Sequence, residues 1–239
     1  MRIRWRKRLK IMRAATWAII CSFIMLILLA GFTVYGARVG TFVINVENEE
    51  IRLSLSVHED LSNQTSRLTF VGVSALSDMT FGFIPEDIAA GVGDKSSQPS
   101  SVYKFMALGF YLVNNSEREV DCVMDLFVTA TVGDPLSVLR VMVIEGENRV
   151  SDGGNRIYAK PEKSVEDERY LKEGLARIRD YDTLPFISED NLFSIKIRDL
   201  KPAEHIKFTL VFWAEGCDID CTDDRINDKI KMRLDITGY

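Results

Sequence analysis

Lys229-Ile230-Lys231-Met232-Arg233-Leu234-Asp235-Ile236 is the stretch of sequence that decides the fold. Apolar side chains occupy every second position, and charged side chains occupy the positions between them. Because successive side chains of a β-strand point to opposite faces, this alternation predicts a strand with one face buried and the other in water. The 3.6-residue period of a helix would place both classes on every face. The C-terminal region is therefore predicted to be a half-buried strand.

Similar runs, bounded by turn residues, occur along the chain upstream of this one. They cover residues 41–46, 51–57, 67–71, 102–113, 119–132, 136–144, 191–200 and 205–214. The run 102–113 is apolar on both faces apart from Lys104, which is typical of a central strand covered on two sides, although its periodicity also fits a buried helix. Roughly ten short strands without a regular strand–helix repeat predict an all-β, jelly-roll-like β-sandwich over residues 38–239.

Residues 162–180 have a different composition from the strands around them. They are rich in charged residues and helix formers, and their apolar residues form a partial stripe. This pattern predicts one amphipathic helix inserted between two strands of the sandwich.

The first apolar run predicts the location of the protein. Residues 14–37 contain no charged side chain, and a helix of this length measures about 36 Å, enough to cross a hydrocarbon core of about 30 Å. Seven basic residues precede it, and no acidic residue appears before Glu47. Basic residues beside a span stay in the cytoplasm. We therefore expect a basic cytoplasmic tail at 1–13, a single transmembrane anchor at 14–37 and an extracellular domain at 38–239.

A cleaved signal peptide is the alternative interpretation of the same run. Its best small-residue cleavage site is Val34-Tyr35-Gly36, but the apolar region exceeds the usual length of about 7–15 residues. The length favours an uncleaved anchor. In both cases everything after Arg38 is expected outside the cell.

The charge of the exported part restricts its partners. Of 30 basic residues, eight lie in 1–38, which leaves 22 against all 35 acidic residues and a formal charge of −13 on 39–239. A domain this acidic is a poor candidate for binding nucleic acid or anionic lipid, and a better one for cations or basic partners.

The four cysteines show no framework of long-range disulfides. Cys21 lies within the predicted span, and Cys122 alternates with apolar neighbours as a small core residue does. Cys217 and Cys221 flank three residues, so they form either a local disulfide or two free thiols. A metal-binding pair is less well supported, because no second cysteine or histidine cluster completes a site. We hypothesise the local disulfide.

Motifs for catalysis are absent from the sequence. His58-Glu59-Asp60-Leu61-Ser62 fails the zinc-protease pattern HExxH at its last position, and Gly72-Val73-Ser74-Ala75-Leu76 lacks the final glycine of a nucleophile elbow. No phosphate-binding glycine loop is present. The sequence therefore predicts a protein that is not an enzyme. A hydrolase that uses a carboxylate pair from different strands is the alternative, because it would leave no motif.

One acidic segment is a candidate binding site. Five carboxylates fall within ten residues, and they are Glu215, Asp218, Asp220, Asp223 and Asp224. Carboxylate oxygens are ligands of Ca²⁺, although the spacing is not that of an EF-hand. The other interpretation is a solvated acidic turn, stapled by Cys217 and Cys221, that caps a helical turn through Thr222 or Asp223.

Three stretches resemble the exported Gram-positive proteins related to the TasA/camelysin biofilm-matrix family. The stretches are 34–44 leading into 53–56; 103–115 with 140–143; and Lys201-Pro202 with 212–216, the acidic cysteine segment and 229–236. The resemblance implies a jelly-roll-like sandwich held at the cell surface, where filament-forming members exchange strands between subunits. This chain differs from those members by its long basic anchor. It also lacks the metal-ligand motif of a camelysin-like protease.

The expected function follows from these observations together. We expect a cell-surface structural or interaction module, in extracellular matrix, biofilm or envelope assembly, with protein partners or self-association. We expect no required cofactor, with Ca²⁺ as an optional stabiliser of the acidic segment.

Overall fold

The structure is a computed structural model that describes most of the predicted extracellular domain and part of the N-terminal segment. The described residues are 16–17, 19–26, 41–47, 51–71, 78–91, 105–147, 155–161, 182–216, 218, 220–222 and 228–239. The chain divides into two compact units, Met1–Val39 and Gly40–Tyr239. The predicted helix at 162–180 lies outside the described residues.

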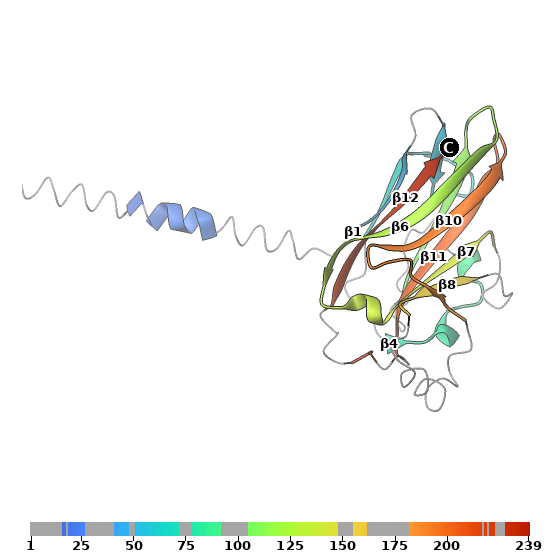
Figure 1. The fold of residues 1–239 in the computed structure, drawn as a ribbon. Coiled ribbons are helices and arrows are strands. Elements are labelled where there is room, and N and C mark those ends of the chain that lie inside the picture. Colours follow the sequence, from blue (N-terminus) through green and yellow to red (C-terminus); the bar gives the residue numbers. More distant parts are fainter. Residues whose placement is uncertain are drawn as a thin grey trace, which may run out of the picture. The chain divides into compact units, whose positions relative to one another are not determined.

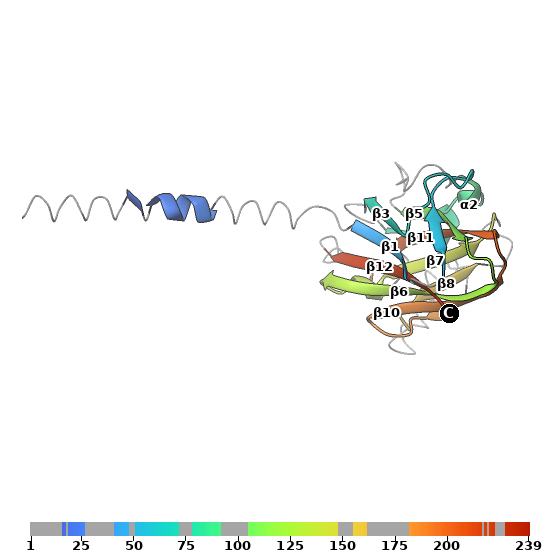
Figure 2. The same ribbon diagram turned by 90° about the horizontal axis from the view of Figure 1, so that it is seen from above.

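The second unit is a β-sandwich of two sheets (Figure 1; Figure 2 shows the sheets as two layers). The first sheet has five strands in the order β10-β6-β12-β1-β3. These are β1 (Thr41–Glu47), β3 (Arg67–Val71), β6 (Val120–Val132), β10 (Asn191–Leu200) and β12 (Lys229–Gly238). The second sheet has seven strands in the order β2-β5-β11-β7-β8-β9, and β4 pairs with β11 beside this path. These are β2 (Leu53–Ser56), β4 (Asp78–Met79), β5 (Met106–Asn114), β7 (Leu139–Glu145), β8 (Arg156–Ala159), β9 (Leu184–Pro185) and β11 (His205–Glu215). The prediction of a β-sandwich is confirmed.

The alternating C-terminal run forms β12, the middle strand of the five-stranded sheet. Met232, Leu234 and Ile236 are buried in the core between the sheets, as predicted. β12 pairs antiparallel with β6 and parallel with β1. The strand after the predicted anchor and the last strand of the chain therefore lie side by side. Alternation in single strands does not predict this parallel pairing.

The apolar run 102–113 supplies β5, every residue of which is buried. One face contributes Leu108, Phe110 and Leu112 to the core between the sheets. Ala107 on the other face belongs to a second apolar cluster, which also includes Trp213. The run therefore forms a strand and not a helix. Both of its faces can be apolar because other segments cover the sheet on both sides.

The second cluster is covered by a short segment that we call the outer cap, residues 78–91. It contains β4, the 3₁₀ helix η1 (Phe81–Phe83) and the helix α2 (Ile88–Gly91). Met79, Ile84 and Ala89 from this segment are buried against the seven-stranded sheet. The sandwich therefore has a third, partial layer that the sequence did not predict.

Two turns depend on individual residues. Asn114 is fully buried, and its side-chain nitrogen Nδ2 donates to the backbone carbonyls of Arg118 and Leu200, each at 2.8 Å. Gly133 has a φ of +77°, and a Cβ there would lie 1.8 Å from Oδ1 of Asp228. Only glycine combines that backbone conformation with that close approach.

Three local predictions are wrong. Residues 135–137 form a second 3₁₀ helix, η2 (Pro135–Ser137), so the strand expected from Leu136 begins at Leu139. Alternation along 119–132 predicts that Ala130 shares the buried face with Cys122 and Met124, but Ala130 is exposed, because a bulge lies opposite Lys231 and Met232. Asp235 was expected in water, and it is only 8% exposed because Asn45 and Arg233 contact its carboxylate.

Within the predicted anchor, residues 16–17 and 19–26 are helical, and the other residues of 14–37 lie outside the described part. Among the described residues, no helix has both the length and the apolar character needed to cross a membrane.

The buried thiol of Cys122 gives a test of the core. Burial raises the pKa of Cys122 from its usual 9.0 to about 12. At pH 8 we therefore expect almost no thiolate and no alkylation of Cys122 by iodoacetamide in folded 40–239, with full alkylation in urea. Since the folded pKa exceeds the unfolded one, this group's stabilising contribution is present below pH 9 and is lost as the pH rises towards 12. Peptide mass spectrometry measures the alkylation, and equal labelling of Cys122 in folded and unfolded protein would contradict the buried placement.

Candidate functional site

The acidic segment 215–224, which we call the acidic loop, begins at the end of β11. Its first residues are fixed by backbone hydrogen bonds to two neighbouring segments. The amide of Glu215 donates to the carbonyl of Val138 at 2.9 Å, and the amide of Gly216 donates to the carbonyl of Met79 at 2.8 Å. The loop therefore starts from a rigid base formed by the outer cap and by the entry to β7.

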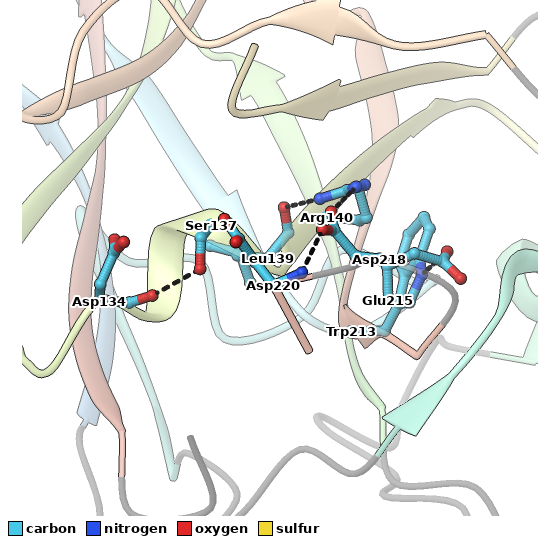
Figure 3. A network of polar contacts seen from close by, with 8 residues as sticks. All are labelled: Asp134, Ser137, Leu139, Arg140, Trp213, Glu215, Asp218 and Asp220. Carbon is cyan, nitrogen blue, oxygen red and sulfur yellow. Dashed lines mark hydrogen bonds and ion pairs between the residues drawn. The ribbon is translucent and has the colours of Figure 1, made fainter. Parts of the chain in front are cut away.

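Trp213 anchors this base to the outer face of the seven-stranded sheet. Its side chain is fully buried, and its ring lies 6.4 Å from that of Phe81 in the outer cap. The indole nitrogen donates to Oε2 of Glu215 at 3.0 Å (Figure 3). Glu215 is itself fully buried, so this bond supplies a partner to a carboxylate that has left water. Among the aromatic residues of β11, Trp213 has direct contact with the loop, whereas Phe208 and Phe212 belong to the core between the sheets.

A buried ion pair holds the next part of the loop. Arg140 on β7 is 1% exposed, and its Nη2 lies 2.5 Å from Oδ2 of Asp218, which is 8% exposed. Arg140 also donates from Nη1 to the carbonyl of Leu139 at 3.2 Å. The other carboxylate oxygen of Asp218 accepts the backbone amide of Asp220 at 3.0 Å (Figure 3). Both oxygens of Asp218 are therefore engaged within the fold.

For the described part of the loop, these contacts correct the interpretation as a solvated acidic turn. Glu215 and Asp218 face into the domain, since both are buried and bonded to residues of the seven-stranded sheet. Asp220 is partly buried. Asp223 and Asp224 lie outside the described residues, and so does Cys217, the predicted disulfide partner of Cys221. The disulfide therefore stays a prediction.

The predicted Ca²⁺ ligands are not brought together by the residues that the structure describes. Within these residues, no group of three or more histidine, cysteine or acidic side chains could hold a metal ion. The full set of five carboxylates extends beyond them, so the Ca²⁺ site also stays a prediction. A rise in melting temperature with millimolar Ca²⁺ would support it.

The described contacts hold the loop in place and do not supply reactive groups. We call the ion pair of Arg140 and Asp218 the clamp. An arginine side chain stays protonated in proteins, so Arg140 has no proton to exchange with a substrate. Taking two charges out of water is costly, and the cost is offset only when both are paired and hydrogen-bonded. Arg140 and Asp218 are paired with each other, and each has a further hydrogen bond to the backbone, so together they fix the loop on the sheet.

Sequence reasoning missed Arg140 and one further pair of carboxylates. A lone arginine inside the apolar run 136–144 was the available signal for a buried charge that needs a partner. Asp125 and Asp235 are directly opposite each other on β6 and β12, on the outer face of the five-stranded sheet. Each lay at a polar position of its own strand, and only the register between the strands makes them neighbours.

Comparisons with known proteins do not show a family for this chain. No family profile matches it, and no curated protein matches it. Among solved structures, it is similar to the collagen-binding domain of the surface protein RspB from Erysipelothrix rhusiopathiae, with 15% sequence identity and a TM-score of 0.16. The alignment covers 56% of this chain and 44% of that one, so the chain spans less than half of that relative. Similarity this weak carries no argument about fold or function.

The clamp predicts a strong energetic coupling between Arg140 and Asp218. Replacing Asp218 alone (Asp218→Asn) removes the negative charge from a buried ion pair with Arg140, and we expect a loss of about 3–5 kcal/mol in the free energy of unfolding. The double variant Arg140→Met/Asp218→Asn should lose clearly less than the two single variants add up to. Urea denaturation of 40–239 and its variants measures the four free energies.

A more exposed pair is the control. Nζ of Lys160 lies 3.7 Å from Oε1 of Glu189, and their side chains are 22% and 82% exposed. Glu189→Gln should cost less than about 1 kcal/mol. Additive effects of Arg140→Met and Asp218→Asn, each as small as that of the control, would contradict the clamp.

Proposed function

We propose that this protein is a cell-surface structural or interaction module and not an enzyme. The observation that carries the proposal is the state of the acidic loop in its described part. Its carboxylates Glu215 and Asp218 are buried and bonded to Trp213 and Arg140, as expected of a rigid structural element. A reactive centre would instead present such groups to a substrate.

The predicted location supports the same function. We propose that residues 14–37 anchor the chain in the cell membrane, with 1–13 in the cytoplasm and the sandwich outside. The long charge-free run and its seven basic flanking residues support this topology. The sandwich then acts as a displayed domain with protein partners or further copies of itself, and nucleic acid is not among its partners.

The resemblance to the TasA/camelysin proteins supports a jelly-roll-like topology and a role in matrix or envelope assembly. The stretches that carry the resemblance coincide with parts of β1, β2, β5, β7, β11 and β12. These strands include the interior of both sheets, so the likeness covers the scaffold of the domain.

A hydrolase that uses two carboxylates is the second candidate, and Asp125 and Asp235 are the pair that favours it. Side chains directly opposite in an antiparallel pair have Cβ atoms about 4.5–5.5 Å apart. However, Asp235 contacts Asn45 and Arg233, and Asn191 donates to Asp125 at 3.4 Å. These contacts fix the pair in the sheet and favour a structural role.

Protease treatment of intact cells tests the proposed location. With a C-terminal tag on the full chain, we expect external protease to remove the tag while a cytoplasmic marker protein stays intact. Immunoblotting before and after cell lysis measures both. A tag that resists protease until the cells are lysed would contradict an extracellular domain.

A further inference from the structure

The outer face of the five-stranded sheet differs in charge from the domain as a whole. Among the side chains that the structure describes on this sheet, six basic and three acidic ones point outward, a net charge of +3, whereas residues 39–239 as a whole carry −13. We call it the basic face. Its basic residues are Arg67, Lys196, Arg198, Lys229, Lys231 and Arg233, and its acidic residues are Asp121, Asp125 and Asp235.

The two signs of charge are not equally available to a partner. Arg67, Lys196, Arg198, Lys229 and Lys231 are all exposed, and none forms an ion pair in the part of the chain that the structure describes. The three acids are buried or half-buried, and each is engaged within the domain. Asp235 pairs with Arg233, Asp125 accepts from Asn191, and Asp121 accepts from the amide of Asp199. The charge that this face presents to an approaching surface is therefore mainly positive.

The negative charges elsewhere on the domain do not cancel this face at close range. Stacked sheets lie about 10 Å apart, whereas the Debye length at physiological salt is about 8 Å. Acidic groups beyond the seven-stranded sheet lie farther than this length from a surface that touches the five-stranded sheet, so salt in the surrounding water weakens their effect on it. Two exposed acids, Asp190 and Asp199, lie at the ends of β10 and reduce the positive charge at that edge of the basic face.

The basic face is also the uncovered face of the sandwich. The outer cap packs on the seven-stranded sheet, and no described element packs on the outside of β10, β6, β12, β1 and β3 (Figure 1). Between its charges lies Phe127, half-buried, with the guanidinium of Arg233 5.7 Å from its ring centre. The basic face is therefore an uncovered sheet surface that a partner with an extended surface can contact.

We propose that the basic face docks on the anionic lipid headgroups of the membrane from which the chain emerges. This inference rests on the proposed anchor. The predicted span ends at residue 37 and β1 begins at Thr41, so the four residue steps between them span about 14 Å at most. β1 belongs to the sheet that carries the basic face. The tether thus keeps this sheet within reach of the headgroups, and basic side chains are attracted to anionic membrane surfaces.

The isolated domain 40–239 is suitable for the test, because every buried residue of the two apolar clusters lies within it. Sedimentation with vesicles of phosphatidylcholine containing about 30% phosphatidylglycerol should pull down the wild-type domain. Vesicles of phosphatidylcholine alone should not, and raising the salt from about 50 to about 300 mM should abolish binding. Equal binding to both vesicle types, or no binding to either, would overturn the proposal.

Two matched variants locate the effect on the face. Lys196→Gln/Arg198→Gln/Lys229→Gln/Lys231→Gln should lower the partition coefficient at least about tenfold. Arg52→Gln/Arg118→Gln/Arg156→Gln/Lys201→Gln removes four exposed positive charges from outside the face and should change it less than about threefold. Asp190→Asn/Asp199→Asn should increase binding. Equal losses in the two fourfold variants would show that net charge, and not this face, determines binding, and would overturn the proposal.

Two further measurements separate the alternatives. Thermal unfolding of each variant checks that it is folded. We expect a melting temperature close to that of the wild type, because all the replaced side chains are exposed. Competition by millimolar glycerol phosphate distinguishes the sources of anionic groups. Persistent vesicle binding supports a lipid surface, and full displacement contradicts it in favour of a small soluble anion. Failure of vesicle binding with a protease-accessible domain on cells would overturn this inference and leave the proposed location intact.

Discussion

The burial of β5 on both of its faces is the constraint on which the rest of the structure depends. A strand with apolar side chains on both faces is stable only where each face is shielded from water, because burial of apolar area is the main favourable term in folding. The five-stranded sheet covers one side, and the outer cap with Trp213 covers part of the other. The seven-stranded sheet therefore needs the outer cap to shield its second apolar face from water.

This constraint also explains the inward orientation of the acidic loop. The loop leaves β11 beside β5, at the margin of the second apolar cluster, where Trp213 is fully buried. A carboxylate that enters such an environment needs a donor, and Trp213 and Arg140 supply donors to Glu215 and Asp218. An acidic sequence can thus be part of a core boundary when its partners come from strands distant in the sequence.

How much of the fold can be predicted from the sequence depends on the range of the interactions that form it. Strict alternation predicted β12 and most of β6, because side-chain period is a local property. The run 102–113 left strand and helix open, since its cover comes from other segments. The orientation of Asp218 and the proximity of Asp125 to Asp235 depend on pairings between distant strands, which composition does not reveal. The basic face was missed for a related reason: a net charge of −13 averages over faces that the fold separates.

Hydrogen exchange of the folded domain, measured by mass spectrometry with peptide resolution, tests the two-sided burial of the seven-stranded sheet most directly. Amides of β5 and β11 each lie between two paired strands under apolar cover, so we predict that they exchange only on global unfolding, as the most protected group in the domain. Edge strands β3 and β10 should exchange by smaller openings. Exchange of residues 106–114 as fast as that of β3 would contradict a sheet covered on both faces.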